Sequence, residues 1–244
     1  MNSVIAAITL RQLISRRRTV LLLLLGGILV LVAFILRLSL DDVYWQLYTS
    51  RLLSNFGIAV LMPLVALLLG TGAIGGELDE GTAVYLLAKP VNRWTVLLTK
   101  LAVASVVSVG LTCLPIFLAG LILDGNLGDG LAIGFVAGAA VGSVVYCAVF
   151  VALSLVTSRA LVFGLAYVLV WEGLLSGLFA GTRTFSVRQQ TLALVDAIAD
   201  VPSRILEAPL ALGTALVVGA IILVGATLLA GRRLASIEIA GDSA

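Results

Sequence analysis

Six long apolar stretches constrain the fold of this chain more than any other feature. They cover approximately residues 19–39, 53–76, 95–123, 131–156, 160–180 and 209–230. A helix needs about 20 residues to cross a hydrocarbon core roughly 30 Å thick, because each residue advances it by about 1.5 Å. Each stretch meets this length, so the sequence predicts an all-α polytopic membrane protein with six transmembrane helices.

The composition agrees with this class and excludes others. Of 244 residues, 61% are hydrophobic and 11% are charged, whereas soluble domains average about 25% charged residues. The sequence has no histidine, which excludes Ser-His and Cys-His nucleophile pairs and histidine-ligated zinc. Both cysteines, Cys113 and Cys147, fall inside predicted spans, where we expect small buried apolar residues rather than a disulfide or a metal site.

The chain also lacks a phosphate-binding loop. Its densest glycine cluster, residues 70–76, is followed by Glu77 at the place where such a loop has a lysine. We therefore expect no nucleotide or other cofactor to be bound by this chain, and no catalytic residue in it.

Basic residues predict the orientation in the membrane. With six spans both termini lie on one side, which holds ten of the 15 Lys and Arg residues: Arg11, Arg16, Arg17, Arg18, Lys89, Arg93, Lys100, Arg159, Arg232 and Arg233. The opposite side holds the others: Arg37, Arg51, Arg183, Arg188 and Arg204. Because basic residues concentrate in cytoplasmic connections, both termini are expected in the cytoplasm.

The segment ahead of the first span, residues 1–18, is predicted to form a helix on the inner membrane surface. Ala6, Leu10, Leu13 and Ile14 share one arc of this helix, and its arginines lie elsewhere around it, near anionic head groups. An ordinary basic flank is the alternative. The apolar run that follows lasts for a full span and lacks a small-residue cleavage site, so we interpret it as an uncleaved first span.

Small residues form a stripe on the fourth predicted span. Gly134, Gly138 and Gly142 recur every four positions and share one helix face. Such a stripe lets another backbone approach closely, so we expect it to serve packing. A substrate path lined by these glycines is the alternative.

Glu172 is the one ionisable residue deep inside a predicted span. A carboxylate at that depth costs a few kcal/mol or more, so it should be protonated, paired or next to water. One interpretation places it in a substrate or proton path. In the other, the fifth helix ends or bends early and leaves Glu172 near the outer head groups.

The connection between the last two spans, residues 181–208, has its own helical pattern. Apolar residues recur at helical spacing along one face: Leu194, Ile198, Val201 and Ile205. Polar residues recur on the opposite face: Asp196, Asp200, Ser203 and Glu207. This pattern predicts an amphipathic helix, or two short ones broken near Pro202, on the outer surface. It would cap the exit of a pathway or, more simply, pack on the bilayer or on the spans.

A short polar run, residues 77–94, separates the second and third predicted spans. Its acidic start favours a helix N-terminus, a short amphipathic turn follows, and Pro90 ends that turn. Lys89, Arg93 and Trp94 are expected to anchor the next span at the inner interface. An ordinary cytoplasmic loop is the alternative. However, the run carries paired leucines beside Lys-Pro, which give it a compact amphipathic surface that a loop exposed only to water does not need.

This run resembles the cytoplasmic signature of type-2 permeases of ATP-binding cassette (ABC) exporters. Between Glu77 and Arg93 the signature takes the form Glu-x3-Gly-Thr-x3-Leu-Leu-Ala-Lys-Pro-Val-x-Arg, and Lys100 follows. The six spans, the inner termini and the helical outer segment are similar to that family over the whole length.

The resemblance implies a division of labour between subunits. Two permease chains, expected to be identical, would pair in a prokaryotic cell membrane, and a separate cytoplasmic ATPase would bind ATP and Mg. A coupling helix in each permease would contact that ATPase through these residues: Glu80, Gly81, Thr82, Leu86, Leu87, Lys89, Pro90 and Arg93. The family would also place Asn55, Glu172 and Ser176 along the translocation path. An accessory protein outside the membrane is compatible with this scheme, and no nucleic-acid partner is expected.

The chain would then be a single permease domain over residues 1–244. Its parts are the inner-surface helix (1–18), spans one and two (19–76), the coupling segment (77–94), spans three to five (95–180), the outer segment (181–208), span six (209–230) and a cytoplasmic tail (231–244).

Two other classes stay open at this point. A secondary carrier or channel working without ATP would concentrate paired charges and broken helices inside its spans. A membrane-embedded lipid-modifying enzyme would need nucleophile and base candidates near the bilayer surface. The carboxylates of Glu77, Asp79 and Glu80 could in principle chelate a divalent ion for lipid chemistry. Successive positions on a helix point in different directions, which weakens that interpretation.

Overall fold

A computed structural model describes residues 3–14, 16–39, 45–79, 92–125, 128–176 and 180–236 of the chain. The regular structure in these ranges is helical, as predicted. The α-helices are α1 (Ser3–Leu13), α2 (Arg16–Ser39), α3 (Trp45–Leu52), α4 (Met62–Asp79), α6 (Arg93–Asp124), α7 (Leu131–Val156), α8 (Ala160–Ala166), α10 (Val187–Ile198) and α11 (Leu212–Ser236). Two π-helical segments, η2 (Leu53–Leu61) and η3 (Tyr167–Leu175), continue α3 and α8, and a 3-10 helix, η4 (Ala180–Phe185), precedes α10.

Five helices in the described ranges are long and apolar enough to cross a membrane. They are Thr19–Ser39, Trp45–Gly75, Arg93–Asp124, Leu131–Val156 and Leu212–Ser236, which match five of the six predicted spans. The fifth predicted span, residues 160–180, contains a shorter apolar helix, Ala160–Leu175. Its length is about 24 Å at 1.5 Å per residue, which is less than the full hydrocarbon thickness.

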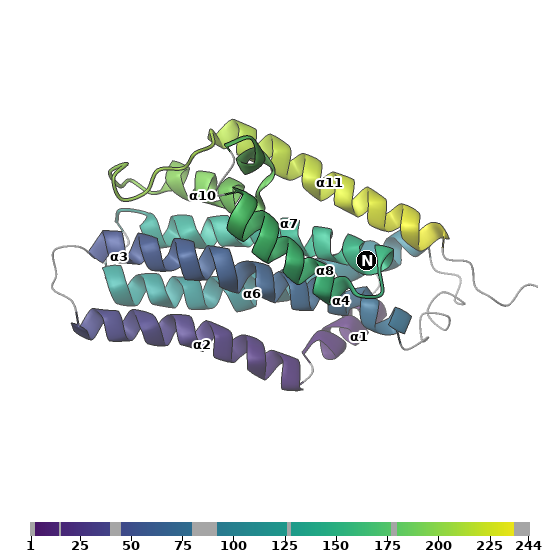
Figure 1. Cartoon of the computed structure of the whole chain (residues 1–244). Helices are drawn as coiled ribbons and strands as arrows, with labels where there is room; N and C mark the ends of the chain where they lie inside the picture. Colours follow the sequence, from purple (N-terminus) through teal and green to yellow (C-terminus); the bar gives the residue numbers. More distant parts are fainter. Residues whose placement is uncertain are drawn as a thin grey trace, which may run out of the picture.

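The bundle is organised around α7. Figure 1 shows α4, α6 and α7 in the middle, α2 along one edge and α11 along the opposite edge. Large side chains of the inner helices are fully buried, among them Met62, Phe135, Tyr146 and Phe150. The outer faces of α2 and α11 carry exposed leucines, isoleucines and valines, as expected for helices that border lipid.

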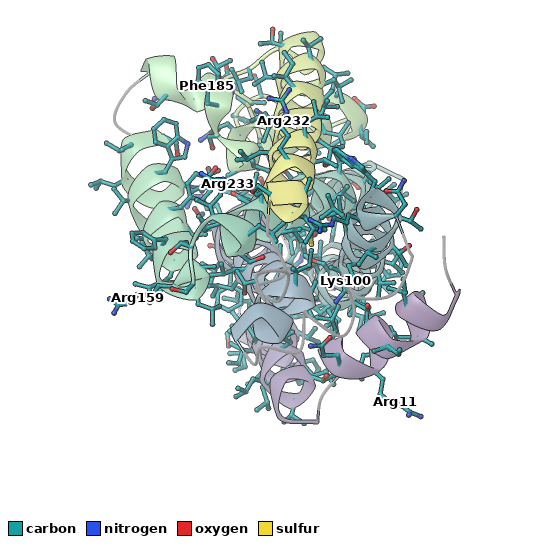
Figure 2. All side chains as sticks on the ribbon, turned by 90° about the vertical axis from the view of Figure 1, so that its right-hand side faces the viewer. Arg11, Lys100, Arg159, Phe185, Arg232 and Arg233 are labelled. Atoms are coloured by element: carbon teal, nitrogen blue, oxygen red, sulfur yellow. The ribbon has the colours of Figure 1, made fainter. Side chains whose placement is uncertain are left out.

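The two ends of the bundle differ in charge. We call them the Arg93 end, where α6 begins, and the Asp124 end, where α6 finishes. Figure 2 looks onto the Arg93 end, where Arg11 extends from α1, Arg159 from the start of α8, and Arg232 and Arg233 from α11. All four side chains are exposed. The described acidic residues Asp124 and Asp129 lie at the opposite end, beside Gln46 of α3 and Arg37 of α2.

A proline explains one irregular helix. The π-helical segment η2 ends at Leu61, two residues before Pro63, and the N–H of Met62 bonds to the carbonyl of Gly57, five residues earlier. Proline has no N–H and its ring clashes with the carbonyl four residues before it, so a regular α-helix cannot pass through unchanged. The wider π-helical turns accommodate this proline without ending the helix.

The outer segment packs on the spans, which is one of the predicted arrangements, but it buries a different face. Its helix, α10, ends at Ile198, and Pro202 begins a separate turn. Helix α10 runs along α7, with Thr191 against Gly138 and Gly142 near the middle of that 26-residue helix. The buried side chains include Val187, Thr191 and Val195, whereas Ile198 is exposed. These small and β-branched side chains fit the glycine stripe of α7 more closely than a row of leucines does.

Candidate functional site

Most of the predicted ATPase-contact residues lie outside the described residues. These are Glu80, Gly81, Thr82, Leu86, Leu87, Lys89 and Pro90. Their contact with an ATPase therefore stays a prediction. Of the predicted set, the structure describes Arg93.

Arg93 ties the start of α6 to the end of α11. Its Nη1 donates hydrogen bonds to the carbonyls of Leu234 at 3.0 Å and Ala235 at 2.8 Å. The ring of the neighbouring Trp94 covers Gly231 so closely that a methyl group there would overlap it. The last carbonyls of a helix have no partner within the helix, so a guanidinium is a favourable cap. Any displacement of the chain at Arg93 thus acts directly on α11.

Lys100 is buried rather than exposed at the inner face. Only 1% of its surface is accessible, and its Nζ donates to the carbonyl of Ala73 at 2.9 Å. Because a buried ammonium needs acceptors, this bond joins α6 to α4 on the side of the Arg93 end. Lys100 therefore has a position inside the bundle that a count of loop charges does not reveal.

Glu172 is the best-defined polar group in the interior. Its side chain is 2% exposed. Oε1 accepts hydrogen bonds from the backbone N–H of Val187 at 2.9 Å and from the hydroxyl of Tyr167 at 3.2 Å. Oε2 accepts a short bond from the hydroxyl of Ser186. Both oxygens of this carboxylate are therefore hydrogen-bonded inside the bundle.

The partners of Glu172 belong to the start of α10. Ser186 is the N-cap of α10 and its Oγ also accepts from the N–H of Gln189 at 3.2 Å. Val187 is the first residue of the helix, and its N–H has no acceptor within the helix. A negative charge at a helix N-terminus is favourable by roughly 0.3–1 kcal/mol, and by up to about 2 kcal/mol where it is partly buried. Glu172 therefore fastens η3 to the buried start of α10.

Ser176 and Asn55 have different surroundings. Ser176 is buried, and its hydroxyl donates to the backbone carbonyl of Glu172 at 2.7 Å, so this bond stays within its own helix. Asn55 is exposed on η2, and its Oδ1 accepts from Nη2 of Arg188 at 3.2 Å. The structure thus brings Glu172 and Ser176 together and places Asn55 beside Arg188, the second residue of α10.

The sequence places Arg188 in the connection between the last two spans, and the structure shows where in that connection it lies. It is half-buried in the first turn of α10, one turn before Thr191, which packs on Gly138 and Gly142 of α7. Its Nε is buried without a hydrogen-bond partner in the described part of the chain. Sequence pattern alone had no signal for this position, because only the course of α10 back along α7 brings the residue inward.

Aromatic rings pack beside Glu172. Tyr146 stacks on Phe150 with ring centroids 5.7 Å apart, and Phe150 meets Tyr167 edge to face at 6.3 Å. The hydroxyl of Tyr146 is buried and has no hydrogen-bond partner among the described residues. Offset and edge-to-face ring pairs stabilise by about 0.5–1.5 kcal/mol beyond their buried area. This packing fixes the position of η3, and with it Glu172.

The glycine stripe of α7 serves packing, as predicted, and its partner is α10. A methyl group at Gly134 would lie 3.1 Å from the carbonyl oxygen of Val195, and one at Gly138 would lie 3.0 Å from that of Thr191. At Gly142 it would overlap the hydroxyl of Thr191. Only glycine permits two helices to approach this closely along so many turns.

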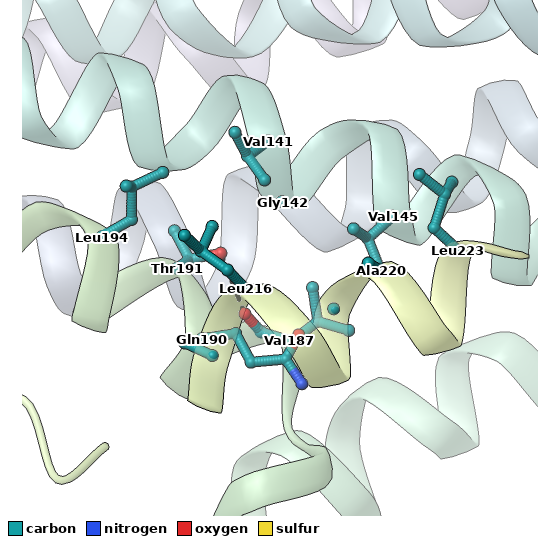
Figure 3. A pocket seen from close by; sticks show the side chains of 12 residues that line it. Val141, Gly142, Val145, Val187, Gln190, Thr191, Leu194, Leu216, Ala220 and Leu223 are labelled. Carbon is teal, nitrogen blue, oxygen red and sulfur yellow. Dashed lines mark hydrogen bonds between the residues drawn. The ribbon is translucent and has the colours of Figure 1, made fainter. Parts of the chain in front are cut away.

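A cavity of about 220 Å³ remains where α7, α10 and α11 meet. Figure 3 shows its lining, which is apolar except for Gln190 and Thr191. The amide of Gln190 donates to the carbonyl of Thr184 at 2.9 Å, and its Oε1 faces Gly219 of α11. The cavity borders α10 on the side of α11, whereas Glu172 and Asn55 reach α10 from η3 and η2.

Comparison with known proteins assigns the chain to a family. The search of curated proteins returns no match. The family model described as ABC-2 family transporter protein matches residues 3–206, which is well over half of the chain. That match includes α1, the π-helical segments with Asn55 and Glu172, the polar run and the whole of α10. The chain therefore belongs to the ABC-2 family of transporter membrane proteins.

Proposed function

We propose that this chain is the membrane-spanning permease subunit of an ATP-driven exporter. The observation that carries the proposal is the family match over residues 3–206, which extends across the polar run with the Gly81-Thr82 and Leu86-Leu87 pairs. The chain has no phosphate-binding loop of its own, so ATP and Mg would be bound by a separate cytoplasmic ATPase. Residues 77–94 would form the coupling segment, and its short helix before Pro90 would contact this partner.

In this proposal the Arg93 end faces the cytoplasm. The exposed arginines Arg11, Arg159, Arg232 and Arg233 at that end support this orientation, because basic residues concentrate on the cytoplasmic side of membrane proteins. Both termini would then be cytoplasmic. Helix α1, next to the start of α2, would lie at the inner surface, and the short helix Ala160–Leu175 would serve as the sixth crossing together with the residues after it.

Coupling would pass from the ATPase into the bundle through α6 and α11. Helix α6 begins at Arg93, directly after the coupling segment, and the same residue holds the end of α11. A shift of the coupling segment on ATP binding would therefore move two spanning helices together. Two permease chains, each with such a segment, would switch between inward-facing and outward-facing arrangements as the ATPase pair closes and opens.

Co-purification from native membranes tests this proposal. In the double variant Leu86→Glu and Leu87→Glu we expect the ATPase to be lost while the permease chain stays in the membrane fraction. The matched control, Leu86→Met with Leu87→Met, keeps both positions apolar and should retain the ATPase. ATP-independent flux by the isolated chain in liposomes, or a complex without any ATPase, would contradict the proposal.

A further inference from the structure

We propose that Arg188 and Asn55 form a binding site for an oxyanion group, a phosphate or a carboxylate, on the translocation path. This inference rests on the exporter function proposed above and names the chemistry of a ligand for it. The site lies where η2 and the start of α10 meet, at the level of the middle of α7.

The first argument is the position of the charge. Arg188 is half-buried in the first turn of α10, one turn before Thr191, whose side chain meets Gly138 and Gly142 of α7. Asn55 belongs to the apolar helix Trp45–Gly75, well inside its ends. A guanidinium at such depth is unfavourable in hydrocarbon, and ionisable groups inside membrane proteins face a wet cavity or another polar group. The surface that Arg188 and Asn55 share is therefore not a plain lipid-facing surface.

The second argument is that Arg188 has donors to spare. A guanidinium carries five N–H donors, and within the described residues Arg188 uses one of them, from Nη2 to Asn55 Oδ1 at 3.2 Å. Its Nε is buried and has no acceptor among the described residues. A buried donor without a partner costs about 1–3 kcal/mol, so a group that supplies acceptors here is bound favourably.

The carboxylate of Glu172 does not supply the missing acceptors for Arg188. No ion pair between Glu172 and Arg188 is present in the described part of the chain. Both carboxylate oxygens of Glu172 already accept bonds from Tyr167, Ser186 and the N–H of Val187. Glu172 thus forms its hydrogen bonds with the start of α10 and with Tyr167, and the donors of Arg188 remain for a ligand.

The third argument is the match of geometry to chemistry. A planar guanidinium donates two parallel bonds to a phosphate or carboxylate, which a single ammonium group does not. The side-chain oxygen of Asn55 accepts the bond from Nη2 of Arg188. The side-chain nitrogen of Asn55 donates to the backbone carbonyl of Arg51 at 2.9 Å. Asn55 thereby orients Arg188, whose other N–H donors remain for an oxyanion.

Equilibrium binding to the native complex tests the site. The complex is purified in neutral maltoside detergent, and the probes are radiolabelled dodecyl phosphate and inorganic phosphate as its competitor. We expect saturable binding of dodecyl phosphate that weakens at least about tenfold in Arg188→Gln, since a bond to a charged group contributes roughly 1.5–3 kcal/mol. Arg188→Lys should lie between the two. Arg204→Gln, which removes an exposed charge in the connection after α10, should bind like the wild type.

A second variant covers the case in which Arg188→Gln does not fold. Asn55→Asp changes one atom of the side chain and places a carboxylate at 3.2 Å from Nη2, where it pairs with Arg188 and competes with the ligand. We expect the same loss of at least about tenfold in affinity. Competition by inorganic phosphate would show that the oxyanion alone suffices, and binding of dodecyl phosphate without such competition would show that the ligand must carry an apolar chain.

Unchanged binding in both Arg188→Gln and Asn55→Asp, or no saturable binding of either probe, would overturn the site. The same samples are examined for the ATPase subunit. A missing ATPase with normal probe binding would count against the exporter function alone, whereas a bound ATPase with unaffected variants would count against the oxyanion site alone.

Discussion

Removing the acceptors at Glu172 should release the start of α10 from the bundle. In Glu172→Leu the N–H of Val187 and the hydroxyl of Ser186 lose their buried acceptor. Each buried donor left without a partner costs about 1–3 kcal/mol, so the loss amounts to roughly 2–6 kcal/mol at one helix end. Local opening of α10 becomes cheaper by this amount, while helices that do not contact Glu172 keep their stability.

Glu172→Gln is expected to have a smaller effect of the same kind. The amide oxygen can still accept from Val187 and Tyr167, and the amide nitrogen can donate to Ser186, so the contacts persist without the charge. Bonds to charged groups contribute about 1.5–3 kcal/mol and neutral ones about 0.5–1.5 kcal/mol, which leaves a loss of roughly 1–2 kcal/mol. The ATPase should still assemble with this variant, and its substrate-stimulated turnover should change.

Hydrogen–deuterium exchange of the purified complex measures this local opening. Amides of residues 190–198 should exchange about 10-fold faster in Glu172→Gln and more than about 30-fold faster in Glu172→Leu, because 1.4 kcal/mol corresponds to a factor of ten. Glu207→Gln, an exposed carboxylate beyond α10, is the control. If α10 exchanges at the wild-type rate in Glu172→Leu, or if α6 accelerates equally, the docking role assigned to Glu172 is wrong.

Two further perturbations probe helix contacts. Gly138→Ala places a methyl group 2.9 Å from Cγ2 of Val195 and 3.0 Å from the carbonyl of Thr191. Overpacking of this kind costs about 1–3 kcal/mol, so the thermal midpoint in detergent should fall, whereas Gly225→Ala, with open space around it, should not lower it. Arg93→Gln removes the donor to the carbonyls of Leu234 and Ala235 and should accelerate amide exchange in the last turn of α11 up to about tenfold. The exposed Arg232→Gln should leave that turn unchanged, and equal exchange in both variants would show that Arg93 does not hold the helix end.

Much of the architecture follows from apolar length and small-residue spacing. The five long spans were all predicted, because about 20 consecutive apolar residues have few alternatives to a membrane helix. The span Trp45–Gly75 begins before the predicted residue 53, and Leu212–Ser236 ends beyond the predicted residue 230. The glycine stripe from Gly134 to Gly142 predicted a close helix contact correctly, since its spacing depends only on helix geometry. The partner in that contact, α10, was not predictable from the stripe.

The partners of Glu172 and the position of Arg188 depend on the course of α10, which the sequence does not reveal. An amphipathic pattern over residues 187–198 does not tell whether the helix packs on a surface or descends beside α7. For that reason Glu172 was identified but its partners Ser186 and Val187 were not, and Arg188 was assigned to an outer loop. The π-helical turns at η2 and η3 also carry little sequence signal, although Pro63 marks the end of one of them.

Cross-linking at the coupling segment tests the central claim most directly. Leu87→Cys is made in a chain whose two thiols, Cys113 and Cys147, are replaced by alanine, and the native membranes are treated with a short thiol-to-amine cross-linker. The account predicts a covalent product between this chain and an ATPase subunit, and no such product from Leu212→Cys at the opposite end of the bundle. A product from Leu212→Cys, or labelling of position 87 only by a reagent confined to the cell exterior, would contradict it.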